Sequence, residues 1–395
     1  MAEGFMEMAS VSGDLTAKLT DDILSDIISR VPYKSTCCCK CVSMRWRDLI
    51  SHPYHRKKMS QSLTGFFHES FNRYRSPRFP KFACCFTNVS GIGEPLVDPL
   101  LSFLPKFVMP GIVDCCNGGL LCSFWKQNGP VECDYVVCNP ATEKWVVVPG
   151  TKWSSKVDVR LAFDPAVSSH FHVCEFIEDR FWSNEDYFDS KDCIAAVVIY
   201  SSKTAVWSHK ADAWSGYEIE TTRFAKIAFF RGVLYLCGFD HKLVALDVEG
   251  NNWKVMPLPP SKCHGDPSYD IYLSQGQLYF AHEGYFELSI WVLEDPSTEK
   301  WTLKHNVKHL KMFRTEYSPY GSSGYSVLSI HPEHSLIFLV CRYEETLMSY
   351  NMDSGELHSL CKLGRDGTTY LTKTCYLPYV PLYLDLLADD TKSLA

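Results

Sequence analysis

The feature that most constrains the fold is a short module that recurs along the chain. Each copy is an alternating apolar strand, then a turn of Asn, Asp, Gly, Pro, Ser or Thr residues, then a tryptophan. Four copies span residues 135–145, 198–207, 244–253 and 290–301, and a degenerate fifth without tryptophan spans 348–357. Turn residues of these types tolerate the tight backbone of a β-hairpin. The module therefore predicts a series of hairpins.

The spacing of the modules predicts how these hairpins are assembled. The closing tryptophans lie 62, 46 and 48 residues apart, and a period of roughly 40–50 residues is typical of β-propeller blades. Short apolar strands at 119–122, 171–176, 232–236, 277–280 and 335–340 supply the other half of each blade. A sixth blade can be assembled from residues 65–67 and 383–386, so that both chain ends close the ring. We expect a mainly β chain with about six propeller blades.

A helical pattern precedes these repeats, over residues 19–50. Thr20 can cap a first helix that carries a single apolar stripe and ends at Pro32, while Ser35 and Ser43 can cap two further short helices. About 35 residues of helix bury too little surface to be stable alone. The unit therefore either caps the large domain or binds a partner, and the residues alone leave these two readings even.

This helical segment resembles the plant F-box over its whole length, in the runs 19–24, 27–32, 34–35, 40–43 and 45–50. The resemblance implies binding to a Skp-type adaptor and, through it, to a cullin and a RING subunit. Some of the matched residues, Trp46 especially, can serve the F-box's own core instead. Carried over by position, the adaptor-binding residues are Leu19, Ile23, Leu24, Ile27, Ile28, Pro32, Val42, Trp46, Leu49 and Ile50.

Three positions depart from the F-box pattern. Thr20 stands where Pro is usual, Thr36 where Leu is usual, and Cys39 where a large apolar residue is usual. Thr36 and Cys39 remove apolar area, so the resemblance leaves it open whether adaptor binding is weaker than in the family.

The repeats resemble the kelch-like F-box-associated domain of plant proteins, a β-propeller. Asn139-Pro140, Thr142 and Trp145, together with the run 163–165, carry this resemblance, which covers residues 61–387. The expected organisation is a disordered N-terminus at 1–14, an F-box at 15–60, the propeller at 61–387, and a flexible tail at 388–395.

Charge and cysteine usage narrow the partners and the compartment. Residues 61–395 carry 30 Lys and Arg against 39 Asp and Glu, a net charge of −9, which is unsuited to a phosphate backbone. The 18 cysteines include directly adjacent ones, and no secretory signal or membrane-length apolar run is visible. We expect a cytoplasmic or nuclear protein that binds neither nucleic acid nor membrane.

We find no sequence signature of catalysis, such as a phosphate-binding loop or a nucleophile elbow. We therefore expect no catalytic residue, cofactor or metal. Two metal sites are alternatives to ordinary packing: zinc at Cys37 and Cys41, and copper at His170, His172 and Cys174, because kelch propellers include copper oxidases. In both places packed side chains are the favoured interpretation.

Aromatic residues in polar, loop-like surroundings are the candidates for target binding, because aromatic side chains dominate binding hot spots. The acidic stretch 178–186 either selects a basic target or is a solvated loop. The candidates are Trp153, Trp182, Tyr187, Trp214 and Tyr320.

The sequence thus predicts a non-catalytic substrate receptor of an SCF-type cullin-RING ubiquitin ligase. The main alternative is a propeller that binds proteins outside any ligase and carries a degenerate F-box. A propeller oxidase or glycan-binding protein is a third, more distant alternative.

Overall fold

The computed structural model describes residues 18–31, 33–52, 55, 63–72, 82–90, 95–104, 111–125, 133–151, 156–179, 193–210, 227–237, 242–259, 268–284, 286–313, 324–341, 344–363, 369–370 and 376–382. The chain separates into two compact units, Met1–Ser60 and Gln61–Ala395. In the described part, no helix has the length and apolar character needed to cross a bilayer.

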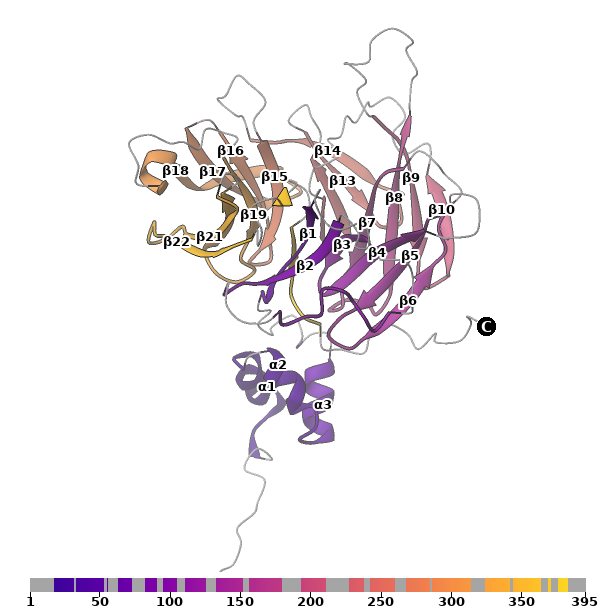
Figure 1. Cartoon of the computed structure of the whole chain (residues 1–395). Coiled ribbons are helices and arrows are strands. Elements are labelled where there is room, and N and C mark those ends of the chain that lie inside the picture. The colour runs from indigo at the N-terminus through magenta and orange to yellow at the C-terminus, as the bar shows by residue number, and fades with distance from the viewer. Residues whose placement is uncertain are drawn as a thin grey trace, which may run out of the picture. The chain divides into compact units, whose positions relative to one another are not determined.

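Within the residues that the structure describes, the smaller unit has the short helices α1 (Asp21–Ser29), α2 (Tyr33–Cys39) and α3 (Met44–Ser51) (Figure 1). The predicted cap of α3 is confirmed, because the Ser43 side chain accepts a hydrogen bond from the Trp46 backbone N–H at 3.2 Å. Thr20 occupies the N-cap position of α1, but its side chain makes no capping bond. The predicted start of the second helix was wrong: α2 begins at Tyr33, before Ser35.

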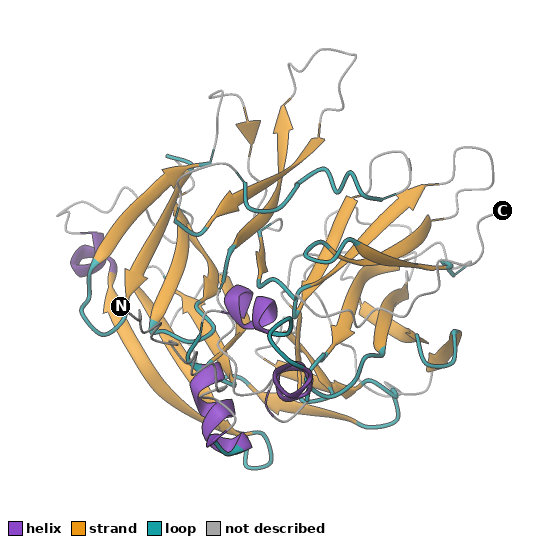
Figure 2. Ribbon diagram, turned by 90° about the horizontal axis from the view of Figure 1, so that it is seen from below, coloured by secondary structure: helices purple, strands orange, loops and turns teal. Residues whose placement is uncertain are grey.

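The larger unit is a six-bladed β-propeller, built from six four-stranded sheets whose paired strands are antiparallel (Figures 1 and 2). Blade 1 is β3 (Gly111–Cys116), β4 (Gly119–Trp125), β5 (Cys133–Asn139) and β6 (Lys144–Val148). Blade 2 is β7 (Lys156–Phe163), β8 (Phe171–Asp179), β9 (Cys193–Ser201) and β10 (Val206–Lys210). Blade 3 is β11 (Ile227–Phe230), β12 (Val233–Cys237), β13 (Lys242–Asp247) and β14 (Trp253–Pro257).

Blades 4 and 5 repeat this order, and the short helix α5 (His309–Phe313) follows blade 4. Blade 4 is β15 (Ser268–Ser274), β16 (Gln277–Glu283), β17 (Glu287–Asp295) and β18 (Lys300–Lys308). Blade 5 is β19 (Tyr325–Ile330), β20 (Leu336–Cys341), β21 (Thr346–Asn351) and β22 (Leu357–Lys362). The predicted apolar strands are the second strands of blades 1 to 5, and the predicted hairpins are their third and fourth strands.

The hairpin turns explain why the tryptophans stand where they do. Four of the five turns contain a residue in the left-handed region two positions before the end of the module, with φ between 55° and 73°. Such a residue lets a short turn follow the right-handed twist of the strands. These four residues are Glu143, Ala205, Glu299 and Gly355.

Two of the tryptophans tie neighbouring blades together. The Trp207 indole N–H donates to the Pro149 carbonyl at 2.8 Å, which links blade 2 to the end of β6 in blade 1. The Trp301 indole N–H donates to the Pro257 carbonyl at 3.2 Å and links blade 4 to blade 3 in the same way. The repeated tryptophan therefore sets how blades stack as well as where a hairpin closes.

Both chain ends build the sixth blade, as the sequence predicts. It contains β1 (Gly65–Asn72), β2 (Phe82–Asn88), β23 (Thr369–Tyr370) and β24 (Leu377–Tyr379). The C-terminal strand described beside residues 65–67 is β24, which precedes the predicted segment. Residues 65–67 pair with β2 on one edge and with β24 on the other, so both edges are already occupied. Residues 383–386 lie outside the described part of the chain.

Buried polar side chains also join the blades. Asp114 on β3 accepts a hydrogen bond from the Leu161 backbone N–H at 2.8 Å, between blades 1 and 2. Glu283 on β16 accepts from the Val327 backbone N–H at 2.9 Å, between blades 4 and 5. Burying a carboxylate is tolerable only when it is hydrogen-bonded. These bonds therefore hold inner strands at fixed positions around the ring.

Candidate functional site

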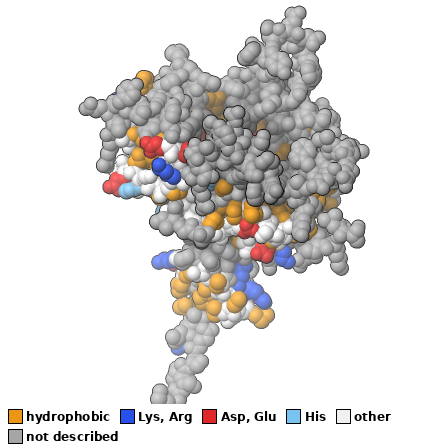
Figure 3. Space-filling model, in the orientation of Figure 1, with side chains coloured by type: hydrophobic (Ala, Val, Ile, Leu, Met, Phe, Trp, Pro, Cys, Tyr) orange, Lys and Arg blue, Asp and Glu red, His pale blue; other side chains and the backbone are white. Residues whose placement is uncertain are grey.

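The helical unit divides its apolar side chains into two sets. One set forms its core and is less than 9% exposed: Leu24, Ile28, Leu49 and Ile50. The other set is exposed: Ile23 at 51%, Ile27 at 43%, Val42 at 65% and Met44 at 72%. On the face drawn in Figure 3, hydrophobic side chains gather over this unit. We call the second set the exposed row.

The predicted adaptor residues fall on both sides of this division. Ile23, Ile27 and Val42 belong to the exposed row, whereas Leu24, Ile28, Leu49 and Ile50 belong to the core. Leu19 and Trp46 are half-buried. Pro32 lies outside the described residues. The sequence reasoning missed Met44, because this residue stands at the start of α3, where no periodic pattern marks it.

The atypical Thr36 is an interior residue of the helical unit. Its side chain is 1% exposed, and its hydroxyl donates to the Val31 carbonyl at 3.1 Å. That carbonyl follows the last turn of α1, where backbone acceptors lack helical partners. Threonine therefore exchanges apolar area for a hydrogen bond that fixes α2 against the end of α1.

An ion pair fixes α3 against the start of α1. Arg45 donates to the Asp21 carboxylate at 2.8 Å and to the Leu19 carbonyl at 2.6 Å. Ile23 and Ile27 are four residues apart on α1 and thus share one helix face. The exposed row is consequently presented on α1, on the turn before α3 and on the first residue of α3, whose mutual arrangement is held by Thr36, Arg45 and the core.

The propeller has two unlike faces. On one, the turn face, first strands connect to second strands and third to fourth. On the other, the connector face, second strands connect to third strands and each blade connects to the next. At the turn face, Asn117-Gly118, Arg231-Gly232 and Gln275-Gly276 form two-residue turns in which both residues have positive φ.

The five residues predicted to bind a target all lie outside the described residues: Trp153, Trp182, Tyr187, Trp214 and Tyr320. Their flanking strands are described, however. The segments that contain them join β6 to β7, β8 to β9, β10 to β11, and β18 to β19. In every case, the strand ends that the segment joins lie on the connector face.

A cavity of about 340 Å³ occupies the propeller channel, lined by residues from the innermost strand of every blade. The Arg160 guanidinium lies 2.6 Å from the Asp158 carboxylate in its wall. Burial raises the pKa of Asp158 to about 6, although Arg160 opposes this shift. Burial likewise raises the pKa of Asp114 and of the Cys116 thiol, which also lines the cavity. The thiol is therefore protonated at neutral pH and is a poor nucleophile.

The structure does not bring the candidate copper ligands His170, His172 and Cys174 together. His170 is exposed and precedes β8, His172 is partly buried on β8, and Cys174 packs in the apolar core between blades 2 and 3. The Cys37 side chain lies outside the described part. Among the residues that are described, no group of three or more His, Cys, Asp or Glu side chains is placed to hold a metal ion.

A helical unit with an exposed apolar row, followed by a closed six-bladed propeller, defines a two-part protein. The model of the family "F-box protein At3g26010-like, beta-propeller" matches residues 99–376, and the F-box domain model matches residues 17–58. The chain belongs to this family of F-box proteins with a β-propeller.

Its relatives in Arabidopsis thaliana extend over most of the chain. F-box protein At5g07610 is 26% identical over 78% of this chain and 76% of that protein. F-box protein At3g26010 is 25% identical over 92% of this chain and 83% of that protein. Putative F-box/kelch-repeat protein At1g15680 is 23% identical over 89% of this chain and 86% of that protein. A chain in the crystal structure of a nidogen/laminin complex gives a TM-score of 0.39 at 9% identity, over 80% of this chain and 96% of that chain.

Proposed function

We propose that this protein is the substrate-recognition subunit of an SCF-type cullin-RING ubiquitin ligase. The observation that carries the proposal is the exposed row on the helical unit. Four large aliphatic side chains stay between 43% and 72% exposed although the unit has a core of its own. An apolar surface on so small a unit is typical of a binding site. The F-box membership of the chain supports a Skp-type adaptor as its partner.

In this proposal the propeller holds a target protein, and the connector face is the side that binds it. The receptor performs no chemistry. It raises the effective concentration of target lysines near the ubiquitin-conjugating subunit. The described cysteines, among them the buried Cys122, Cys174 and Cys341, are free thiols. Free thiols support a reducing compartment, and we assign the protein to the cytoplasm or nucleus.

The test is adaptor binding by the full chain and by an Ile23→Asp/Ile27→Asp variant. Fully burying an isoleucine contributes about 2 kcal/mol, so the exposed halves of these two contribute about 1 kcal/mol each on binding. Aspartate in their place adds an unpaired carboxylate to the interface, at a cost of several kcal/mol. We expect at least a hundredfold loss of adaptor affinity, measured by titration calorimetry.

The matched control is Val167→Asp, which places the same charge at another exposed aliphatic residue, 64% exposed on the propeller. It should bind adaptor as the native chain does, and both variants should unfold at the native temperature. Undiminished adaptor binding by the double variant refutes the assignment of the exposed row. A native chain that binds no adaptor supports the ligase-independent alternative.

A further inference from the structure

Blade 4 carries an apolar and basic corner on the connector face. We call Phe286, Lys308, Leu310 and Lys311 the blade-4 corner. Phe286, just before β17, is 82% exposed, and Leu310 on α5 is 52% exposed. The two lie close together, because the His309 backbone N–H donates to the Phe286 carbonyl at 2.9 Å. Lys308 and Lys311 are exposed on either side of Leu310.

The corner is held rigidly from beneath. His309 is 2% exposed, and its Nε2 is hydrogen-bonded to the Tyr325 hydroxyl of blade 5 at 2.8 Å. Met312 is buried in the core shared by blades 4 and 5, and Phe313 packs against that core. Helix α5 therefore has one anchored side, while Leu310 and Lys311 stay accessible. A preorganised surface of this kind loses little conformational entropy when it binds a partner.

The charge of the corner is opposite to that of its surroundings. Residues 300–313 contain four lysines and no Asp or Glu, within a unit of net charge −9. Lys300 is paired with Glu294 at 2.7 Å. Within the described part of the chain, no ion pair involves the other three, Lys304, Lys308 and Lys311, although Glu287 lies opposite Lys308 in the β17–β18 pairing. Burial, and then the charge of Lys311, lower the pKa of His305.

We propose that the blade-4 corner binds an acidic segment of the target protein, with a large apolar side chain of that segment packed against Phe286 and Leu310. The proposal rests on the function proposed above, which gives the propeller a target to hold. The two corner cations, Lys308 and Lys311, select carboxylates, and the exposed Phe286 supplies apolar contact area. A phosphate backbone would use the cations alone and would meet the net negative charge of the rest of the unit.

The experiment is a selection from a displayed library of random twelve-residue peptides, made with the full chain. The same selection is run with Phe286→Ala and with Lys308→Gln/Lys311→Gln. We expect enriched peptides that carry net negative charge and a large apolar residue. The most enriched peptide, labelled for fluorescence anisotropy, should bind Phe286→Ala about 30-fold more weakly, the loss typical of a hot-spot residue. The lysine variant should bind about tenfold more weakly and with less salt dependence.

Matched controls make the same chemical changes elsewhere on the propeller. Leu96→Ala truncates another exposed apolar residue, 68% exposed, and Lys362→Gln neutralises another exposed lysine. Both should bind the selected peptide as the native chain does. Enrichment of neutral or basic peptides, or enrichment that survives both corner variants, overturns the proposal. Equal competition by a duplex oligonucleotide also overturns it, because the cations alone would then explain binding.

Adaptor binding is measured on the same preparations, which separates this inference from the proposed function. Adaptor binding without any corner-dependent peptide refutes the corner alone. Corner-dependent binding of acidic peptides by a chain that binds no adaptor refutes the ligase role and leaves the corner as a peptide-binding site.

Discussion

The closing blade provides the sharpest test of how the propeller is stabilised. Tyr379, on β24, is 0% exposed, and its carbonyl accepts a hydrogen bond from the Thr64 backbone N–H at 3.0 Å. Its ring packs edge-on against Phe67 and Phe86, with centroids 5.3 and 6.1 Å apart. These contacts join the last strand that the structure describes to the first two, β1 and β2. Tyr379→Ala removes the ring contacts and keeps the backbone pairing.

The expected loss follows from the size of the side chain removed. Truncating a fully buried aromatic residue costs about 4 kcal/mol, against a total stability of about 5–15 kcal/mol for a folded domain. At about 2 °C per kcal/mol for a unit of this size, the unfolding temperature should fall by about 8 °C. Tyr279→Ala is the matched control, because Tyr279 is 1% exposed but lies within blade 4, away from the closure.

In a closed ring the two substitutions should act alike. Each should lower one cooperative transition by a similar amount, followed by circular dichroism. Hydrogen exchange of β12 and β13 in blade 3 should accelerate in both variants, although Tyr379 is in blade 6. If Tyr379→Ala accelerates exchange only in blades 6 and 1 while β12 and β13 keep native protection, the ring does not unfold as one unit and the reasoning is refuted.

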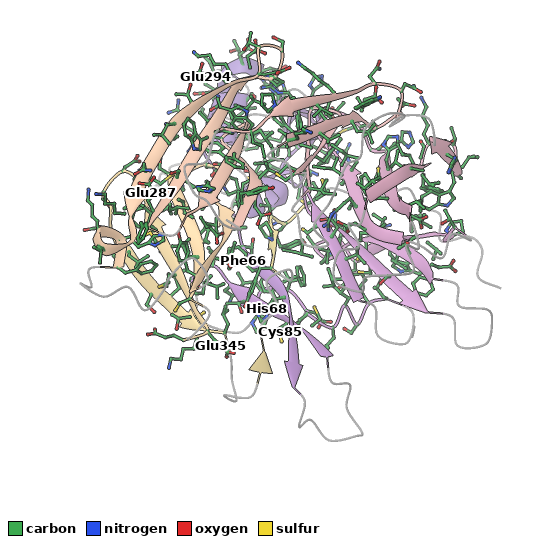
Figure 4. The ribbon with its side chains drawn as sticks, turned by 90° about the horizontal axis from the view of Figure 1, so that it is seen from above. Phe66, His68, Cys85, Glu287, Glu294 and Glu345 are labelled. Atoms are coloured by element: carbon green, nitrogen blue, oxygen red, sulfur yellow. The ribbon has the colours of Figure 1, made fainter. Side chains whose placement is uncertain are left out.

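Two further predictions concern single residues. Burial lowers the pKa of His68, labelled in Figure 4, from 6.5 to about 4. As the pH falls, the His68 imidazole therefore takes up its proton in the unfolded chain before it does so in the folded chain. Stability that is present above pH 6.5 is lost as the pH falls towards 4, by about 3 kcal/mol in total. Urea unfolding of His68→Gln should show a flatter pH dependence in that range, and an unchanged slope contradicts the assignment. Gly118 and Gly232 both have positive φ, 85° and 82°. Their surroundings differ, because a Cβ at Gly118 would lie within 3 Å of atoms of Val380 and Leu382, whereas a Cβ at Gly232 would meet nothing within 4 Å. Gly232→Ala should therefore lower the stability by the backbone strain alone, about 1–2 kcal/mol, and Gly118→Ala should lower it clearly more. Equal falls in the unfolding temperature of the two variants would show that the close contact at position 118 is relieved at no cost in stability.

The repeat could be predicted from sequence because its signals are local. Each module spans about a dozen residues, which contain the alternation of apolar and polar side chains, the turn residues and the closing Trp. The spacing between modules then predicts the blades. The closing strand could not be predicted this way. Both 377–379 and 383–386 are short apolar segments, and the choice between them depends on pairing with Gly65–Phe67, more than 300 residues away. No local pattern contains that information.

The candidate binding residues were predictable to different degrees. The period of α1 marks an apolar stripe, but the stripe is wide, and only packing against α2 and α3 decides that Ile28 is core while Ile27 is exposed. Phe286 and Leu310 gave no signal at all. Each is a single apolar residue beside a strand end or in a five-residue helix, and only the fold brings them together.

The unlike faces of the propeller support the proposal that target recognition belongs on the connector face. At the turn face, the turns at Asn117-Gly118, Arg231-Gly232 and Gln275-Gly276 join strands through two residues of positive φ. An inserted residue there would change the turn type and shift the strand register, which moves core side chains to the wrong side of the sheet. At the connector face, the segments 180–192 and 211–226 join their strands through thirteen and sixteen residues. Such connections can change in length and sequence without altering any strand pairing. If the protein is the receptor proposed above, it can therefore acquire new targets while its blades, their tryptophan ties and its closing strand stay the same.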